Sequence, residues 1–250
     1  MSNETIRALH TNKIGKVSDK WNSYLDYYDE ALASIKNQNI SMLEVGVQNG
    51  GSLETWSSYF KNGQSFIGCD IDPNCAHLKY EDPRINIVIG DVNSQDAYNK
   101  ITAINSSFDL IIDDGSHQSI DIINAFINYF ALVKPGGRYI IEDSHCLYMK
   151  DFGGGLLNEY SAQYFFKKLT DVVSYQWWKS DSSIDVYLQT FFTKQDVPSF
   201  ITEGWIESVE FRNSIITIRK SKHAGHDKLG KRIISGSDTL VQNWGGNRPT

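Results

Sequence analysis

The stretches FDLIIDDGSH at residues 108–117 and GRYIIEDSH at residues 137–145 decide the fold of this chain. Each begins with an apolar run typical of a strand and ends in an acidic run followed by a histidine. The interval between them is long enough for one crossover helix, which is the pattern of two parallel strands in a βαβ unit. Both acidic runs should therefore lie at the carboxyl edge of one sheet, where open α/β sheets bind ligands.

The acidic runs place Asp114, His117, Glu142 and Asp143 at this edge. Converging carboxylates repel one another unless a cation offsets their charge, and a divalent metal with oxygen ligands is the natural candidate. For Asp114 the alternative is an Asx turn before glycine, and for His117 it is a cap on the following helix. Because side chains alternate along a strand, Asp113 should point away from Asp114 and form hydrogen bonds within the rim of the sheet.

The rest of the chain alternates between strand-like and helix-like segments as far as residue 143. Strands are expected near 40–46, 65–70, 84–89, 108–113 and 137–142, and helices near 52–61, 73–80, 94–104 and 118–133. This alternation predicts a parallel sheet with helices on both faces. Pro135, Gly136 and Gly137 predict a turn into the fifth strand. The first 35 residues look helical and aromatic, and after residue 143 we expect an irregular loop, a helix near 159–178 and a β-hairpin over 205–220.

Bulk properties exclude some classes of protein. A length of 250 residues suits one large α/β domain, and a net charge of −6 argues against a nucleic-acid binder that neutralises many phosphates. Cys69, Cys75 and Cys146 make an odd number with no CxxC spacing, which is typical of reduced thiols in a cytoplasmic protein. The sequence begins without an apolar signal core and has no run typical of a membrane span, so we expect a soluble, cytoplasmic protein.

A glycine-rich turn, EVGVQNGGS at residues 44–52, follows the first expected strand and precedes a helix. Glycines there let a ligand approach the backbone, and the helix start offers N–H donors, although a plain tight turn is the alternative. Asp70 ends the second strand, where an acidic residue can accept ribose hydroxyls. Asp91 ends the third strand and is placed to meet an adenine edge. Neither GxxxxGK[ST] nor a full GxGxxG occurs, which argues against a P-loop triphosphate or a dinucleotide.

Taken together, these motifs resemble those of a class I S-adenosylmethionine-dependent methyltransferase. The pair IIDDGSH and KPGGRYIIEDSH more narrowly resembles the macrocin and mycinamicin sugar O-methyltransferases and their bacterial glycan-modifying relatives. The resemblance implies a Rossmann-like, seven-stranded, mostly parallel sheet in the order 3-2-1-4-5-7-6, with helices on both faces and an antiparallel last strand. It suggests a helical segment over the active site at 1–35, a methyltransferase domain at 36–220 and a polar tail at 221–250.

The resemblance also implies roles for individual residues. The implied contacts to the cofactor S-adenosylmethionine are Glu44, Gly46, Gly50, Ser52, Asp70, Asp91 and Asp113. The implied ligands of Mg²⁺, with Mn²⁺ tolerated, are Asp114, Glu142 and Asp143. The implied catalytic residues are His117, as general base, and Asp114.

The predicted function is methyl transfer from S-adenosylmethionine to a sugar hydroxyl of a glycan, a nucleotide sugar or a glycosylated natural product. A catechol-type O-methyltransferase acting on a small aromatic diol, a non-catalytic cofactor-binding module and a related metal-dependent hydroxylase remain alternatives. The expected partner is a carbohydrate or a glycosylated small molecule, with no nucleic acid and no membrane span, and a homo-oligomer is left open. The sequence names neither the acceptor nor the methylated hydroxyl, and it leaves open whether His145, Trp177 and Trp178 contact substrate.

Overall fold

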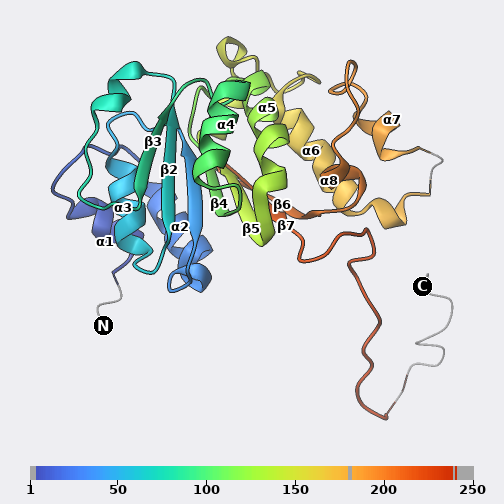
Figure 1. The fold of residues 1–250 in the computed structure, drawn as a ribbon. Helices are drawn as coiled ribbons and strands as arrows, with labels where there is room; N and C mark the ends of the chain where they lie inside the picture. Colours follow the sequence, from blue (N-terminus) through green and yellow to red (C-terminus); the bar gives the residue numbers. More distant parts are fainter. Residues whose placement is uncertain (1–3, 180–181, 239, 241–250) are drawn as a thin grey trace.

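The computed structural model describes residues 4–179, 182–238 and 240; part of the predicted tail, 239 and 241–250, lies outside the described residues. Seven strands form one sheet in the order β3-β2-β1-β4-β5-β7-β6 (Figure 1). They are β1 (Ser41–Val45), β2 (Ser65–Asp70), β3 (Ile85–Ile89), β4 (Phe108–Asp113), β5 (Val133–Ile141), β6 (Ile206–Arg212) and β7 (Ile215–Lys220). Strands β1 to β5 are parallel, and β7 lies antiparallel between β5 and β6. The predicted strand order and antiparallel last strand are confirmed.

The helices cover both faces of this sheet. They are α1 (Ile6–Thr11), α2 (Asn22–Leu32), α3 (Gly51–Tyr59), α4 (Gln95–Ile104), α5 (Ser119–Tyr129), α6 (Ala162–Val173), α7 (Ile184–Leu188) and α8 (Ser199–Thr202). Helices α1, α2 and α3 bury one hydrophobic cluster, and α4, α5 and α6 bury the other (Figure 1). Side chains that alternate along β4 reach both clusters. Ile111 packs into the cluster under α4, α5 and α6, and Leu110 and Ile112 pack into the cluster under α1, α2 and α3.

The structure corrects several predicted elements. The structure has a short 3₁₀ helix at Pro73–His77. The predicted helix over 73–80 is therefore wrong for the residues after His77. Leu78 and Tyr80, two positions apart, both pack against the same hydrophobic cluster, which an extended segment allows and a helix does not. The predicted turn at Pro135 instead lies inside β5, where the pairing with β4 shifts register. Residues 12–21, in the supposedly helical start of the chain, form neither helix nor strand.

Helix boundaries elsewhere differ by a few residues. The helix predicted over 159–178 is α6, followed by a separate 3₁₀ turn at Tyr175–Trp177. Its start is fixed by Ser161, whose side chain accepts from the backbone N–H of Tyr164 as an N-cap. The helix predicted over 118–133 ends as an α-helix at Tyr129 and continues as a 3₁₀ turn at Phe130–Leu132. These differences leave the loops at the carboxyl ends of the strands where the sequence places them.

Phe126 on α5 lies at the centre of an aromatic cluster that joins the sheet to its covering helices. It is fully buried, and the ring centroids of its partners lie 4.8–6.0 Å away. The partners are Phe130, Tyr139 of β5, Phe165 and Phe166 of α6, and Phe200 of α8. Because α5 follows the DDGSH turn directly, this cluster also fixes the position of that turn.

We expect Phe126→Ala to lower the free energy of unfolding by about 3–5 kcal/mol, since it removes a large buried ring and leaves a cavity. Urea unfolding followed by circular dichroism measures the loss. Ile120→Ala is the matched control on the same helix, because its side chain is 62% exposed; the control should stay within about 0.5 kcal/mol of the parent chain. A loss below about 1 kcal/mol for Phe126→Ala would contradict this account of the core.

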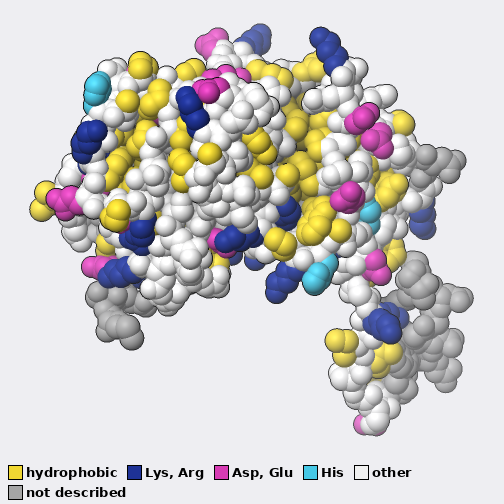
Figure 2. Space-filling model, in the orientation of Figure 1, with side chains coloured by type: hydrophobic (Ala, Val, Ile, Leu, Met, Phe, Trp, Pro, Cys, Tyr) yellow, Lys and Arg dark blue, Asp and Glu magenta, His cyan; other side chains and the backbone are white. Residues whose placement is uncertain are grey.

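The surface mixes side chains of different kinds. On the face shown in Figure 2, Lys and Arg residues are interspersed with Asp and Glu, and hydrophobic side chains reach the surface between them. A wide patch of one charge is therefore not a feature of this face. Among the described residues, no helix is both long and apolar enough to cross a membrane.

Candidate functional site

A cavity of about 800 Å³ opens at the carboxyl ends of the parallel strands. It is lined by residues from the loop before α2 and from the turns after β1, β2, β3, β4 and β5. This is the size and position expected for a small-molecule site in an open α/β sheet. The two acidic runs and the glycine-rich turn that the sequence singles out therefore meet in one place.

The glycine-rich turn contributes Gly46 and Ser52 to the cavity wall, whereas Glu44 and Gly50 are not among the lining residues. Gly46 has φ of +85°, and a Cβ at this position would lie only 2.0 Å from the carbonyl oxygen of Asp114. The turn after β1 therefore needs glycine to pass close to the turn after β4.

Glu44 is fully buried beneath the turn. Its carboxylate accepts hydrogen bonds from Ser52 Oγ at 2.7 Å and Trp56 Nε1 at 2.9 Å. Burial raises its pKa, although Lys20 and these hydrogen bonds oppose the change. Glu44 thus ties the end of β1 to the first turns of α3 and holds the cavity wall in place.

Asp70 lies in the cavity wall at the end of β2. Its carboxylate accepts hydrogen bonds from the backbone N–H groups of Val47, Gln48 and Asp72 at 2.7–2.8 Å. Burial alone would raise the pKa of Asp70, but these backbone donors lower it, so the carboxylate stays ionised. Asp91, after β3, also lines the cavity. The two predicted nucleoside-binding residues are therefore brought to the same wall.

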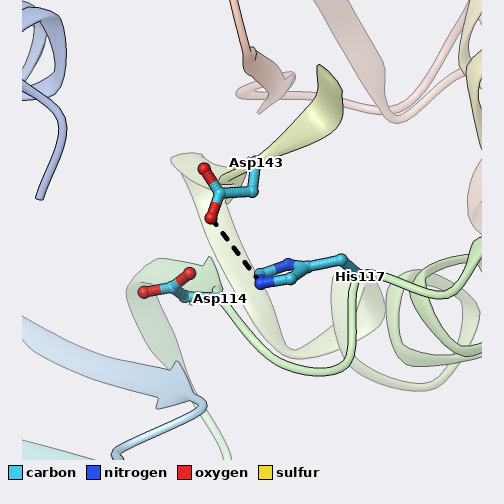
Figure 3. Close-up of side chains that lie close together, drawn as sticks. All are labelled: Asp114, His117 and Asp143. Carbon is cyan, nitrogen blue, oxygen red and sulfur yellow. Dashed lines mark ion pairs between the residues drawn. The ribbon is translucent and has the colours of Figure 1, made fainter. Parts of the chain in front are cut away.

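Asp114, His117 and Asp143 all line the cavity, and their side chains lie close together (Figure 3). One ligand atom from each lies within 4.8 Å of the others, and His117 Nε2 is 3.6 Å from Asp143 Oδ2. His117 and Asp143 have φ of +57° and +50°, in the left-handed region that residues other than glycine rarely adopt. Strained backbone of this kind clusters at functional sites, where surrounding contacts hold it.

Asp113, one residue before this group, has a different environment. It is buried and accepts a hydrogen bond from Tyr139 Oη at 3.0 Å, while Asp114 contacts Lys20. Burial raises the pKa of Asp113 to about 7. The alternation expected from the strand and the hydrogen-bonding role within the rim agree with these contacts. Asp113 also borders the cavity, so its predicted role at the cofactor stays a prediction.

The ammonium of Lys20, a residue that the sequence did not single out, pairs with both Glu142 and Asp114. Lys20 Nζ lies 2.6 Å from Asp114 Oδ2 and 2.8 Å from Glu142 Oε2. Burial alone would lower the pKa of Lys20, but the two carboxylates raise it well above its ordinary value, so the ammonium stays charged. Tyr28 Oη donates to the other oxygen of Glu142 at 2.6 Å. Both carboxylate oxygens of Glu142 therefore accept a hydrogen bond from the amino-terminal part of the chain.

Asp143 is held by aromatic residues from the same part of the chain. Tyr24 Oη donates to Asp143 Oδ1 at 2.7 Å, and Trp21 Nε1 donates to the same oxygen at 3.0 Å. The rings of Tyr24 and Tyr28 are buried, and their hydroxyl groups reach the site. The sequence did not reveal this role, and the only signal was the spacing that brings positions 24 and 28 to one face of a helix.

His145, whose role the sequence leaves open, borders this cluster, with Nδ1 3.8 Å from Asp143 Oδ1 and 2.5 Å from Ser214 Oγ. Its ring meets Trp21 edge-on. Trp178 packs against two tyrosine rings next to α7. His226 of the tail pairs with the carbonyl oxygen of Thr202 through Nε2. Within the described part of the chain, the cysteines at 69, 75 and 146 are free and buried.

The donor set of the acidic cluster suits a hard divalent cation. Asp114 and Asp143 form one group with His117, whereas Glu142 is outside that group and lines the same cavity. Their carboxylates offer the oxygen ligands that Mg²⁺ and Mn²⁺ prefer. The position of Lys20 also demonstrates that Asp114 and Glu142 can reach one cation together. The arrangement can therefore hold a metal beside an imidazole, in the cavity that Asp70 and Asp91 also line.

The chain resembles known proteins along most of its length. A family described as a methyltransferase domain matches residues 43–144. The chain is 26% identical to 8-demethyl-8-alpha-L-rhamnosyl tetracenomycin-C 2'-O-methyltransferase of Streptomyces olivaceus over 86% of this chain and 55% of that protein. It is 36% identical to mycinamicin VI 2''-O-methyltransferase of Micromonospora griseorubida over 52% of this chain and 34% of that protein.

Among solved structures, the chain is similar to MycE methyltransferase from the mycinamycin biosynthetic pathway in complex with Mg and SAH. The two are 26% identical with a TM-score of 0.68, over 84% of this chain and 52% of that one. The chain thus spans at most 55% of the length of these relatives.

Proposed function

We propose that this chain, which carries a methyltransferase domain on a Rossmann-like seven-stranded fold, transfers a methyl group from S-adenosylmethionine to a sugar hydroxyl of a glycosylated acceptor. The observation that carries this proposal is the convergence of Asp114, His117 and Asp143 at the end of a cavity whose other wall holds Asp70 and Asp91. A base and a set of oxygen ligands then lie beside a place for a nucleoside cofactor. The names of the two relatives, both O-methyltransferases and one acting on a rhamnosyl compound, support the same reaction.

S-adenosylmethionine, when bound, supplies an electrophilic methyl group on sulfur. Asp70 is assigned to the ribose hydroxyls and Asp91 to the adenine edge, because both end strands at the cavity wall. Gly46 and Ser52 border the adjoining part of the cavity, where the turn after β1 lets a ligand approach the backbone. Glu44 supports this turn from below through Ser52 and is assigned an indirect role.

The metal ligands are assigned to Asp114, Glu142 and Asp143, with Mg²⁺ as the ion. Mg²⁺, when bound, would lower the pKa of the acceptor hydroxyl and fix its orientation. Tyr24 and Tyr28 hold Asp143 and Glu142 in place by donating to one oxygen of each carboxylate. Such supporting hydrogen bonds orient ligands and are part of how a protein tunes its metal site.

His117 is assigned as the general base. Its Nε2 points toward Asp143 at the edge of the carboxylate cluster (Figure 3), so the proton of an acceptor hydroxyl bound there would pass to Nε2. As it loses its proton, the oxygen of the acceptor hydroxyl attacks the methyl carbon, and the bond from that carbon to sulfur breaks. Much of the acceleration would come from holding the two reactants in line within the cavity.

A turnover screen tests this function. The purified chain with S-adenosylmethionine and Mg²⁺ is given rhamnosyl and other glycosides in one series and catechols in another, and S-adenosylhomocysteine and methylated products are measured by mass spectrometry. We expect methylation of at least one glycoside. Methylation confined to catechols would favour the catechol-type alternative, and cofactor binding without turnover on any acceptor would favour a non-catalytic module.

Asp70→Asn should weaken binding of S-adenosylhomocysteine about 10- to 100-fold, since it removes the charge from hydrogen bonds worth roughly 1.5–3 kcal/mol. Isothermal titration calorimetry measures the change, and thermal unfolding checks that the turn after β1 is intact. Asp72→Asn is the matched control, because Asp72 lies in the same wall and its side chain caps a 3₁₀ helix. Equal affinities for Asp70→Asn and the parent chain would overturn the assignment of the ribose site.

A further inference from the structure

Lys20 carries a positive charge into the carboxylate cluster. Its side chain is only 6% exposed, and its ammonium bridges Asp114 and Glu142, which lie on different strand ends. Across residues 4–179 and 182–238, no other lysine or arginine forms an ion pair with either of these carboxylates. The metal ligands proposed above are therefore already neutralised in part by a group that belongs to the chain.

Lys20 lies near the end of a segment that runs along the cavity. We call this segment, residues 13–21, the strap. At its other end, Lys13 and Lys16 pair with Glu54 of α3, and the carbonyl oxygen of Val17 accepts from the backbone N–H of Gly51 at 3.0 Å. The strap thus runs from the start of α3 to the ends of β4 and β5, and residues 17–21 line the cavity. It closes over both the proposed cofactor wall and the proposed metal ligands.

Two side chains hold this end of the strap: Lys20, through its buried ammonium, and Trp21, whose indole N–H donates to Asp143 Oδ1. Residues 13–21 form neither helix nor strand, and Val17 and Trp21 are 64% and 60% exposed. Exposed side chains contribute little hydrophobic stabilisation, whereas a buried ammonium between two carboxylates makes charge-assisted hydrogen bonds to both. Lys20 is therefore the strap residue that ties this segment to Asp114 and Glu142, next to the contact between Trp21 and Asp143.

A metal ion and the ammonium require the same space. Mg²⁺ bound by both Asp114 and Glu142 would lie about 2.1 Å from each oxygen. The point between these two oxygens is the one that Lys20 Nζ fills, at 2.6 and 2.8 Å from them. Two cations that close would also repel each other. One site can hold the metal or the ammonium, and not both.

We propose that Lys20 is an internal cation that keeps Asp114 and Glu142 together in the metal-free chain and that a divalent metal must displace it. This inference rests on the metal ligands of the proposed function. Metal binding and release of the strap from the carboxylates are then one event. Lys20 acts as a positioning residue that sets the affinity for metal and couples it to opening of the cavity.

Calorimetry with Mg²⁺ alone, without cofactor, gives the first test. If the ammonium occupies the site in most molecules, Lys20→Met removes the competitor, and Mg²⁺ should bind at least about tenfold more tightly than to the parent chain. Lys20→Arg keeps the charge and should bind Mg²⁺ no more tightly than the parent. Lys16→Met is the matched control, because this strap lysine pairs with Glu54 of α3, which is not one of the proposed metal ligands, and its loss should leave the affinity unchanged.

The outcomes distinguish failure of the displacement of Lys20 from failure of the metal site itself. Equal or weaker Mg²⁺ binding by Lys20→Met, with clear binding by the parent chain, would overturn displacement and leave the metal site standing. It would indicate that the metal uses the group of Asp114, His117 and Asp143 while Lys20 stays in place. Absence of Mg²⁺ binding in both proteins would overturn the metal site and the displacement with it.

Limited trypsin digestion of the parent chain gives a second test that needs no variant. Trypsin requires an accessible lysine, and Lys20 is buried while it bridges the carboxylates. Saturating Mg²⁺ should make cleavage after Lys20 appear, and a chelator should suppress it again. Cleavage after Lys61, whose side chain is 68% exposed, provides the internal reference. Protection of Lys20 that does not change at saturating Mg²⁺ would contradict the displacement.

Discussion

Replacing His117 with alanine is expected to lower turnover roughly 100- to 10,000-fold, which is the usual contribution of a positioned general base. The imidazole lies 3.6 Å from Asp143, among the proposed metal ligands, and is not one of the residues assigned to the cofactor, so the affinity for S-adenosylhomocysteine should stay nearly the same. Initial rates with a glycoside acceptor and calorimetry with the cofactor product measure the two effects. A loss of turnover without a loss of cofactor affinity is the signature of a base that faces the acceptor.

A control at a second histidine sharpens this experiment. His223→Ala is the matched control, because His223 is exposed in the tail and far along the chain from the cavity. Near-normal turnover in His117→Ala would leave His117 as a residue that starts a helix, with no role in proton transfer.

Asp114→Asn is expected to lower turnover by roughly 1,000-fold, since loss of a bound metal removes several kcal/mol of transition-state stabilisation. It removes the carboxylate that lies within reach of both His117 and Asp143, and with it one partner of Lys20. Mg²⁺ affinity measured by calorimetry should fall in parallel. Chelation of the parent chain should reproduce the loss of turnover, and added Mg²⁺ or Mn²⁺ should restore it.

A variant with the same chemical change at the surface controls for charge. Asp96→Asn removes a carboxylate that is 72% exposed on α4 and paired with Lys100, so its turnover and Mg²⁺ affinity should match those of the parent chain. Full turnover by the parent chain after thorough chelation would remove the metal from the reaction. Asp114 would then be a residue of the turn after β4 that holds Lys20.

The relation between Asp113 and Asp114 explains why much of the site could be predicted. Side chains alternate along a strand, so the sequence itself sends Asp113 into the rim of the sheet and Asp114 into the cavity. The two acidic runs follow strands that pair in parallel, with Asp113 opposite Ile141, so their carboxylates must emerge at one edge. Local pattern and strand order together bring the β4 and β5 turns into one site.

Boundaries that the sequence misplaced depend on contacts between distant segments. Residues 73–80 have a helix-like composition, yet Leu78 and Tyr80 turn inward to the cluster beneath α3 and end the 3₁₀ helix early. Burial of side chains against a preformed surface outweighs a weak local preference. Such contacts are invisible in a single sequence, because nothing in the local pattern specifies which surface the segment will meet.

The sequence by itself determined the parallel sheet, the turns that hold the acidic clusters and the glycine-rich turn after the first strand. Only the tertiary structure placed Lys20 between Asp114 and Glu142, 94 and 122 positions away along the chain. The lysine has no local signal, since an isolated charged residue in an irregular segment is normally exposed to solvent. Its burial is decided by the charge of carboxylates that the sheet has already gathered, and that charge exists only once the strands are side by side.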